Sequence, residues 1–454
     1  MKKYQLIFIL TVSALLQNLS AQSDKKRWSL NDCINYALDE NIQIKKNRIL
    51  ENESEVSLKS AKAALFPSLS FSLGQNVTNT PWQEDGNNYI QGSEGTIYSN
   101  ESNRKTTYSG NYSLNAQWTL FNGGQRLNNL KQEKLNNQIT GLNVSQQENS
   151  ITEQITQAYI QILYAAESVK TNENTVKLSE KQLERGKELY TAGSIAQADL
   201  AQLEAQFSSD KYQLVNAQIT LRNYKLQLKQ LLEIDGSEEM DLEIPEINNN
   251  GVLVLLPAID EVYNTALAFR PEIQSGKLDI ERSELGVGAA KAGYMPTISM
   301  NAGVSTNHSS GIENSLSYKL RNGWRNTVGL SLSLPIFDNR QTKSAVEKAR
   351  LQSYDSKLNL ISEQKALYKT IESLWLDASG AQQQFLAAKE KLASAQKSYD
   401  QVSQQFSLGM KNTVEILTQM NLLLAAQQEL LQAKYMAILN QGLLKFYQGE
   451  KISF

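Results

Sequence analysis

The stretch YTAGSIAQADL, residues 190–200, interrupts a segment that otherwise has the pattern of one long helix, with no proline between Trp82 and Ile244. A second stretch, FSLGMKNTVEI at residues 406–416, repeats the interruption 216 positions further along the chain. Glycine commonly ends a helix because it adopts the left-handed backbone conformation without steric cost. We therefore expect the two glycines of these stretches to be the tips of two antiparallel helical hairpins.

Apolar residues recur at alternating spacings of four and three along the segment before each glycine, which is the pattern of a coiled-coil seam. In the second half every seam position up to Phe406 is apolar or aromatic, and the seam up to Tyr190 follows the same spacing in the first half. The seams predict one hairpin over about residues 125–232 and another over about 340–448. At a rise of 1.5 Å per residue, the incoming helix of each hairpin would reach about 100 Å.

Each hairpin belongs to one of two tandem repeats. NYALDENIQI at residues 35–44 matches NTALAFRPEI at 264–273, and LFNGGQ at 120–125 matches IFDNRQ at 336–341. Both halves have the same order of elements, with two strand-like segments before the helical hairpin. The expected division is a first repeat at 22–250, with strands at about 66–78 and 106–121, and a second repeat at 251–454, with strands at about 296–306 and 324–337.

The four strand-like segments alternate apolar and polar residues, which indicates strands with one apolar and one polar face. Segments of about ten residues with aromatic residues near their ends are typical of an outer-membrane β-barrel, although the hairpins of a soluble sandwich alternate in the same way. In a barrel, the apolar side chains would face lipid, and the serines and asparagines between them would face the lumen. The predicted lipid-facing residues are Leu69, Phe71, Leu114, Trp118, Leu330 and Leu332.

The N-terminus has the features of a secretory signal peptide. Lys2 and Lys3 precede a short apolar core, and Ala21 supplies a small residue at the expected cleavage point. We therefore exclude residues 1–21 from the mature fold. The chain carries 45 Lys+Arg and 47 Asp+Glu, and this near-neutral balance gives no electrostatic reason to expect nucleic acid as a partner.

Residues that carry enzyme chemistry are scarce in this sequence. Cys33 is the one cysteine, so no internal disulfide is expected, and His308 is the one histidine, in a segment that we expect to be a polar loop. A structural zinc site needs several such ligands, and the sequence contains neither a phosphate-binding loop nor a catalytic Ser/His/Asp set. We therefore expect a protein that is not an enzyme and has neither a metal nor a cofactor.

Four strands are too few to close a membrane barrel, for which about eight is the practical minimum. An open sheet in lipid would leave backbone N–H and C=O groups without partners. If these strands enter a membrane, several chains must therefore share one barrel, and the product is a ring-shaped oligomer with a pore on its axis.

The ordered set of FPSL at 66–69, LFNGGQ at 120–125 and a tip with the pattern aromatic-x-x-Gly, within tandem halves, resembles the TolC-type outer-membrane efflux protein family. The resemblance covers nearly the whole mature chain, about Trp28 to Gly449. It implies a homotrimer with a 12-stranded β-barrel in the outer membrane and a 12-helix barrel across the periplasm. Residues near 233–260 and the C-terminal end would form a belt around the middle of this tunnel. A periplasmic coiled-coil adaptor or scaffold without a barrel is the main alternative, and the alternating strands argue against it.

The resemblance also implies a function and partners. The chain would be the passive exit duct of a tripartite efflux pump or of a type I secretion system. It would dock tip-to-tip with a periplasmic membrane-fusion adaptor, and an inner-membrane pump, driven by protons or by ATP, would supply the energy through that adaptor. The tip residues could alternatively be plain solvated turns. Those expected to contact the adaptor are Gly193, Ser194, Ile195, Gly409, Met410 and Lys411.

Tips in this family end in a constriction that is often ringed by acidic side chains. By that pattern Glu415 would face the lumen, and three copies would form a ring that attracts cations. Asp199 holds the matching position in the first hairpin, whereas Thr418 stands where a second acid is common, so the ring would be weaker. Both acids also lie near helix N-termini, where the helix dipole favours carboxylates, and this is the alternative interpretation.

The closed state in this family is often held by a tyrosine of the second tip that bonds an aspartate of the first. Here that position is Phe406, which cannot donate a hydrogen bond, and Tyr190 holds the matching place in the first hairpin. Lys411 could reach the polar groups of the first tip, including Asp199. The expected gate and selectivity residues are Glu415, Asp199, Lys411, Phe406 and Tyr190.

Overall fold

The chain folds into two compact units in the computed structural model, which describes residues 27–82, 89–92, 95–98, 106–237, 240–245, 251–310 and 315–452. The predicted signal peptide at residues 1–21 lies outside the described residues, as do parts of the predicted loop at 78–106 and of the predicted belt at 233–260. Each unit takes part of both sequence repeats. Unit 1 comprises Met1–Leu50, Gly141–Ser275 and Leu360–Phe454, and unit 2 comprises Glu51–Thr140 and Gly276–Asn359.

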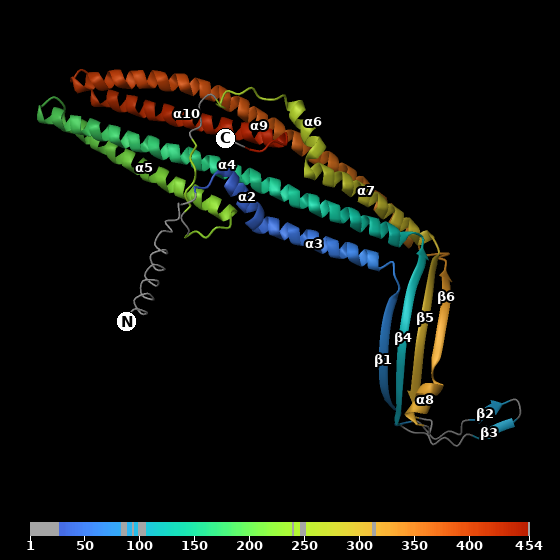
Figure 1. The fold of residues 1–454 in the computed structure, drawn as a ribbon. Helices are drawn as coiled ribbons and strands as arrows, with labels where there is room; N and C mark the ends of the chain where they lie inside the picture. Colours follow the sequence, from blue (N-terminus) through green and yellow to red (C-terminus); the bar gives the residue numbers. More distant parts are fainter. Residues whose placement is uncertain are drawn as a thin grey trace, which may run out of the picture. The chain divides into compact units, whose positions relative to one another are not determined.

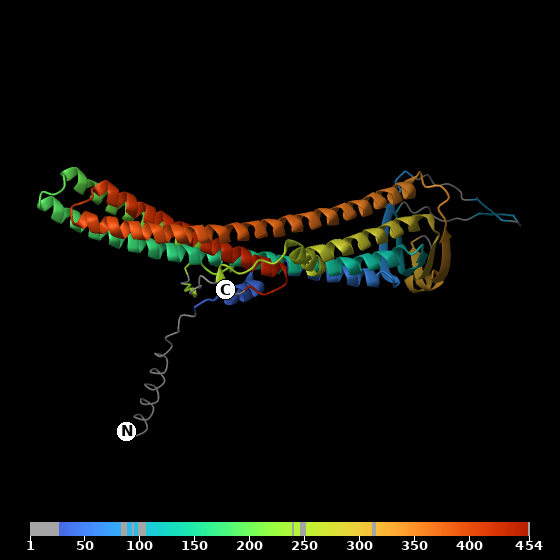
Figure 2. The same ribbon diagram turned by 90° about the horizontal axis from the view of Figure 1, so that it is seen from above.

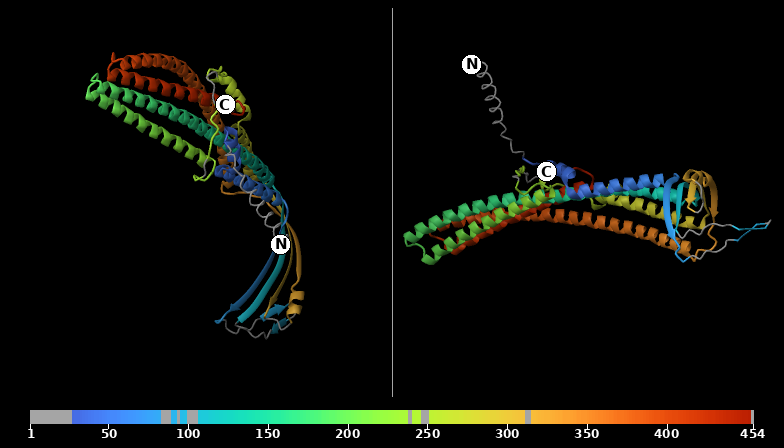
Figure 3. Two further views of the ribbon diagram at one scale, coloured as in Figure 1. Left: turned by 60° about the vertical axis from the view of Figure 1, so that its left-hand side comes forward. Right: turned by 90° about the horizontal axis from the view of Figure 1, so that it is seen from below.

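Unit 2 contains a four-stranded antiparallel sheet in which the strand order is β1-β4-β5-β6 (Figure 1). Its strands are β1 (Ser68–Asn79), β4 (Thr106–Asn122), β5 (Thr297–Ser309) and β6 (Arg325–Ser333). Figure 3 shows that the four strands twist and curve together, as pleated strands of L-residues do. The sequence predicted only loops where the structure has the short strands β2 (Tyr89–Gly92) and β3 (Gly95–Tyr98) and helix α8 (Leu316–Asn322).

Two strand ends differ from the alternation in the sequence. β6 ends at Ser333, whereas the alternation predicted a strand to about residue 337. Pro335 explains the difference, because proline lacks the N–H that would continue the ladder. β5 extends to Ser309, so His308 is a strand residue and does not lie in a polar loop, as we had predicted.

A β-bulge interrupts the pairing of β4 with β5 near the junction with the helices. Trp118 pairs with Met300, but after the bulge Phe121 pairs with Ile298, and Leu120 is the extra residue. A bulge inserts one unpaired residue and bends the strand. In a strand that alternates without interruption Leu120 would belong to the apolar series with Trp118, whereas Phe121 takes that place in the ladder.

The helical part of unit 2 is tied to the sheet where α3 (Ile42–Ala63) ends and α4 (Gln125–Thr191) begins. Trp118 Nε1 donates a hydrogen bond of 2.8 Å to the carbonyl oxygen of Leu65. The Arg126 guanidinium donates to the carbonyl oxygens of Ala64 and Thr119. The carbonyls of Ala64 and Leu65 follow the last turn of α3, where the helix supplies no partners, so the two side chains fix the turn from helix to strand. The remaining helices of this unit belong to α7 (Pro271–Lys291) and α9 (Gln341–Ser407).

Unit 1 is a helical bundle of two long hairpins that lie side by side with their tips at the same end (Figure 2). One hairpin joins α4 to α5 (Gln197–Leu231), and the other joins α9 to α10 (Thr413–Tyr447). The seams predicted from the sequence form the core, because Ile155 of α4 and Ile371 and Phe385 of α9 are almost completely buried. Helices α2 (Leu30–Glu40) and α6 (Ile259–Phe269) pack beside the hairpins.

The chain segments 240–245 and 251–258 lie against this bundle without regular secondary structure. Their backbone groups are satisfied by glutamine and tyrosine side chains of the hairpins: Gln382 and Gln441 donate to the carbonyl oxygen of Val252, and Tyr159 donates to that of Glu243. Two of the glutamines in these helices thus hold an irregular segment, whose peptide groups must be paired when buried.

Candidate functional site: the hairpin tips and the sheet

Both hairpin tips close with the same backbone motif. Gly193 N–H donates to the carbonyl of Tyr190 at 2.9 Å, and Ser194 N–H donates to that of Leu189 at 2.8 Å. The second tip repeats these bonds at Gly409 and Met410, with distances of 2.9 and 2.9 Å. The two glycines have φ values of 73° and 72°, and this pattern is the Schellman motif. The left-handed turns predicted from the sequence are thus confirmed.

The aromatic residues of the two tips occupy different environments. Phe406 is fully buried in a cluster with Leu203 and Ile416, so within this chain it is a core residue and does not line an opening. Tyr190 is 43% exposed at the matching position. The seam interpretation therefore describes Phe406 better than the gate interpretation, because a fully buried ring fills the hairpin interior.

Glu415 is held at the start of α10 by three hydrogen bonds. Its backbone N–H donates to the Asn412 side chain at 2.9 Å, its carboxylate accepts from Asn412 N–H at 3.1 Å, and it also accepts from Lys411 Nζ. This is a capping box with an added ion pair. The bond from the Lys411 ammonium, with that from the Asn412 N–H, keeps the pKa of Glu415 below its usual value. The carboxylate is therefore ionised at neutral pH and remains 39% exposed.

Asp199 holds the equivalent third position of α5, where its carboxylate accepts from the Ala196 N–H at 3.2 Å. Lys411, which the sequence suggested as a partner for Asp199, instead forms its ion pair with Glu415. The reason is local, because Lys411 directly precedes the Asn412 N-cap of α10, and the capping box brings the Glu415 carboxylate back towards that end of the helix. Each acid thus caps its own helix.

The exposed tip surface is more apolar than the sequence suggested. Met410 is 70% exposed, as predicted for a contact residue, whereas Ile195 is half-buried against the tip core. Leu408 and Val414 are 73% and 58% exposed, and sequence reasoning missed both. Both are apolar residues within five positions of Gly409 that do not belong to the coiled-coil seam, and this is the signal that could have identified them as exposed. Three large apolar side chains thus extend into solvent at the second tip.

The register of the sheet brings all six predicted lipid-facing residues onto one face. In an antiparallel sheet, directly paired residues share a face. Phe71 pairs with Leu114, which pairs with Val304, and Trp118 pairs with Met300, which pairs with Leu330. Leu69 and Leu332 belong to the neighbouring rows of this face. All six side chains lie in rows that continue across at least three strands, so the apolar face is continuous across the sheet.

The opposite face of the sheet is polar along the same length. Ser72 pairs with Ser113, which pairs with Ser305, and the two serine hydroxyls of the first pair are 2.6 Å apart. Asn115 and Ser331 lie on this face as well. A sheet with one apolar and one polar face can separate lipid from water.

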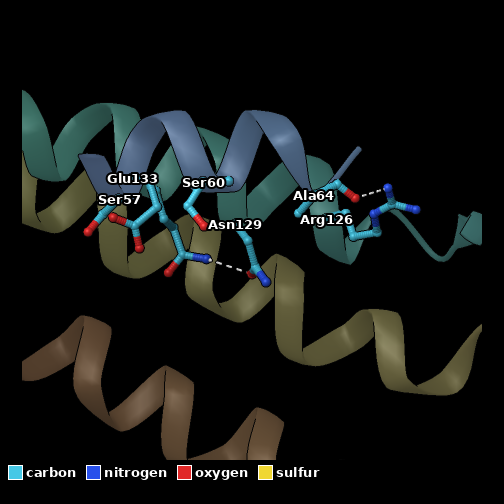
Figure 4. A pocket seen from close by; sticks show the side chains of 8 residues that line it. Ser57, Ser60, Ala64, Arg126, Asn129 and Glu133 are labelled. Carbon is cyan, nitrogen blue, oxygen red and sulfur yellow. Dashed lines mark hydrogen bonds between the residues drawn. The ribbon is translucent and has the colours of Figure 1, made fainter. Parts of the chain in front are cut away.

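A polar pocket lies in unit 2 between α3 and α4 (Figure 4). Ser57, Ser60, Asn129 and Glu133 line it, and its volume is about 430 Å³. The one lining cation, Arg126, is occupied by the backbone carbonyls of Ala64, just after α3, and of Thr119 in β4. Among the described lining residues, this pocket therefore offers no free cation, and Glu133 is its one carboxylate.

Within the described ranges, no group of three or more His, Cys, Asp or Glu side chains could hold a metal ion. Among the same residues, no helix combines the length and apolar character needed to span a bilayer. Cys33 is buried in α2.

Comparison with known proteins gives a consistent result. The model of the outer membrane efflux protein family matches residues 33–233 and 262–449. Outer membrane protein TolC of Salmonella enteritidis is 22% identical over 412 residues, which are 90% of this chain and 79% of that protein. Outer membrane protein TolC of Escherichia coli K12 is 24% identical over 298 residues, 64% of this chain and 60% of that protein, so this match spans less than two thirds of its length.

Solved structures share the fold over almost the whole chain. CusC is 19% identical with a TM-score of 0.78, and the match covers 92% of this chain and 91% of that one. The outer membrane protein VceC from Vibrio cholerae is 15% identical with a TM-score of 0.75, and the match covers 93% and 97%. At these identities the likeness concerns the fold.

Because the family model covers most of the sequence, this chain belongs to the outer membrane efflux protein family. The fold class predicted from the sequence is confirmed: the chain is mainly helical, with an antiparallel sheet, like the outer-membrane channel structures that it matches. The location and the general function follow, namely the outer membrane and export through a channel.

Proposed function

We propose that three copies of this chain assemble into one outer-membrane channel-tunnel and that the channel is the passive exit duct of a tripartite efflux pump or type I secretion system. The observation that supports the shared barrel most directly is the sheet of unit 2. It has a continuous apolar face, a polar face, and two outer edges, at β1 and β6, that pair with no other described strand.

The strand directions favour closure between copies. Each neighbouring pair in the order β1-β4-β5-β6 is antiparallel, so β1 and β6 run in opposite directions. β6 of one copy could therefore continue the antiparallel ladder onto β1 of the next, which would satisfy both edges in lipid. A ring of copies built in this way has no free edge.

The size of the lumen that each number of copies would leave favours three copies. Two copies would give eight strands, and a barrel of that size is filled by its own side chains. Three copies would give twelve strands and leave an open, polar lumen, in agreement with the trimer that the family resemblance implies. The conduit would then be passive, because the chain itself carries no recognisable nucleotide-binding motif.

The tips of the helical hairpins are our candidate docking surface for a periplasmic membrane-fusion adaptor, through which an inner-membrane pump would act. Leu408, Met410 and Val414 present apolar surface there, and exposed apolar groups commonly mark contact surfaces. Gly193, Ser194 and Lys411 complete the proposed contact region. Glu415 is our candidate for a cation-attracting ring at the tip opening, with Asp199 as the weaker second acid.

The decisive experiment is native mass measurement in mild detergent combined with single-channel recording in planar bilayers. We expect a trimer that conducts ions with a small conductance while its tips are closed. A stable, water-soluble monomer that retains its strand content would overturn the proposal and favour the periplasmic scaffold instead.

A further inference from the structure

The interior of the first hairpin, α4 with α5, changes from apolar to polar halfway along its length. Near the tip, Leu183 and Leu203 belong to one apolar cluster, and towards the other end Leu228 belongs to another. Between Ala165 and Leu183 of α4, and between Leu203 and Leu228 of α5, every buried residue is polar. These buried residues are Asn172, Thr175, Ser179 and Asp210. We call the stretch that contains them, 168–182 of α4 with 204–218 of α5, the polar section.

Two side chains of the polar section bond along their own helix and so add little to the contact between α4 and α5. Asn172 Nδ2 donates to the carbonyl of Ser168 at 2.8 Å, and the Thr175 hydroxyl donates to that of Thr171 at 3.1 Å. A hydroxyl that bonds back to the preceding turn slightly destabilises a helix and often bends it. The seam residue Val176 is only half-buried here. The two helices of the hairpin are thus joined weakly in this section.

Asp210 lies in the seam with only 4% of its surface exposed. Its Oδ1 accepts from Gln206 of the same helix at 2.9 Å, and its Oδ2 has no hydrogen-bond partner among the described residues. The Ser179 hydroxyl faces it across the seam, but a hydroxyl has one proton, for which the carbonyl of Val176 at 3.1 Å competes. A buried carboxylate with an unpaired oxygen lowers stability, so Asp210 weakens the contact of α4 with α5.

The second hairpin provides an internal comparison, because its seam follows the same spacing 216 positions further on. From Phe385 to Phe406 in α9, and from Ile416 to Ala433 in α10, every buried residue is apolar. The residues that match Asn172, Ser179 and Asp210 are Ala388, Ala395 and Ala426. The apolar seam therefore continues through the second hairpin and is interrupted in the first.

Two side-chain bonds connect the polar section to α10 of the second hairpin. Ser168 donates to Gln428 at 3.2 Å, and Gln206 donates to Asn421 at 3.4 Å. Amide side chains have several rotamers and can follow a small displacement of the helix that carries them. The neighbouring hairpin therefore guides the polar section without fixing it.

We propose that the first hairpin bends at the polar section when the tip opens, while the second hairpin keeps its shape. The inference rests on the proposed function only for the opening that the bend would serve. Asp210 lies about 25 Å along α5 from Gly193, so a bend of about 10° there would move the tip by about 4 Å. The contact that changes is the tip cluster, in which Leu183 and Leu203 meet Tyr399 and Ile416 of the second hairpin.

The test measures amide hydrogen exchange in the purified full-length oligomer in detergent. Peptides from 168–182 and 204–218 are compared with the equivalent peptides 384–398 and 420–434, as protection factors corrected for sequence. Local opening with few buried apolar contacts gives fast exchange. We expect the polar section to exchange about tenfold faster than its equivalent in the second hairpin.

Substitutions test the cause and the consequence. Asp210→Ala, which copies Ala426 of the second hairpin, should slow exchange in the polar section about fivefold and leave the second hairpin unchanged. It should also make openings to high conductance at least threefold rarer in single-channel recordings. Asn172→Ala, which copies Ala388, should act in the same direction. Glu204→Ala removes an exposed carboxylate from the same helix and should change neither measurement.

Four results would overturn the proposal: equal exchange in the two hairpins of the unchanged protein, unchanged exchange in Asp210→Ala, slowing of both hairpins to the same degree, or openings as frequent as before in a variant whose polar section exchanges more slowly. Every variant is also checked for oligomer mass and conductance. Any of these results in an oligomer that conducts contradicts only the hinge, whereas the absence of an oligomer or a pore in the unchanged protein contradicts the proposed function.

Discussion

Leu114 occupies the middle of β4, the longest strand of the sheet, and provides the sharpest test of the proposed membrane-facing surface. β4 runs from Thr106 to Asn122, so Leu114 lies eight residues from either end. Its side chain is 42% exposed on the apolar face, between Phe71 of β1 and Val304 of β5. In a membrane barrel this position falls near the bilayer midplane.

Replacing Leu114 with arginine should therefore be costly. An arginine on the lipid face of a barrel near the midplane costs about 2–4 kcal/mol per chain, and the cost falls towards the interfaces. Such a change corresponds to about a 30- to 1,000-fold loss in the folding equilibrium constant. The matched control is Asn115→Arg, which changes the next residue on the polar face and should cost less than about 0.5 kcal/mol, as surface substitutions usually do.

The assay is refolding from urea into phosphatidylcholine vesicles at a fixed chain concentration, because the stability of an oligomer depends on concentration. The folded fraction is read from resistance to SDS on unheated gels across a urea series. Equal losses for Leu114→Arg and Asn115→Arg, or a loss below about 0.5 kcal/mol for the former, would refute the assignment of the two faces.

An independent measurement uses single cysteines at 330 and 331 in a Cys33→Ala background. The register places Leu330 on the apolar face and Ser331 on the polar face of β6. In vesicles, a water-soluble maleimide should label Ser331→Cys and leave Leu330→Cys largely unlabelled. Equal labelling of the two would argue against a barrel strand.

Three further predictions concern the helical unit. Glu415→Ala should reduce block by divalent cations in single-channel recordings. The Lys411 ammonium keeps the pKa of Glu415 below its usual value of 4.5, so block of the unchanged channel should persist until the pH falls below that value. If the variant is blocked as strongly as the unchanged channel, Glu415 is a helix cap only. Asp210→Asn should stabilise the bundle by about 1 kcal/mol at neutral pH, the cost of an unbonded buried polar atom, since Asp210 is 4% exposed with Oδ2 unpartnered among the described residues. Burial raises the pKa of Asp210 above 3.8. The loss of folding stability caused by its charge is therefore absent below pH 3.8, grows as the pH rises, and is complete above the raised pKa. If urea titrations show that Asp210→Asn stabilises the protein equally at every pH, the charge of Asp210 is not the cause. Glu233→Gly should raise the free energy of unfolding by about 1 kcal/mol, because a non-glycine residue in the left-handed region costs about 1–2 kcal/mol and Glu233 has a φ of 59° just after α5. Glu233→Ala is the control: it keeps the backbone strain and should not give this gain.

The fold class could be predicted because the apolar residues recur with two periods, one typical of packed helices and one typical of strands. The alternating spacing of four and three predicted the seams that Ile155 and Phe385 occupy in the core. The period of two in the strands predicted the face on which Leu69 and Leu332 lie. Both patterns depend only on which side chains avoid water, and burial is the strongest term in folding. The glycine tips were predictable for a comparable reason, since a positive φ restricts the choice of residue.

The features that escaped prediction depend on single pairings and contacts, which the pattern of apolar residues does not encode. The bulge at Leu120 changes one pairing and leaves the composition of β4 unchanged. The partner of Lys411 is Glu415 at its own tip, and the sequence had suggested Asp199. Phe406, by contrast, is buried as its place in the predicted seam required. Arg270, which is buried between Glu153 and Glu272, has no sequence signature at all, because its two partners come from different parts of unit 1.

The closed hydrogen-bond pattern of the tips bears on how such a protein can be modified. Each turn is completed by bonds within six residues, from Leu189 to Ser194 and from Gln405 to Met410. A segment that determines its own conformation can be exchanged as a cassette, and chimaeras that carry the tip of another family member should keep the seams of the host. A change of adaptor, whether during evolution or by design, would then require about a dozen substitutions, all in the two tips, while the rest of the chain stays the same.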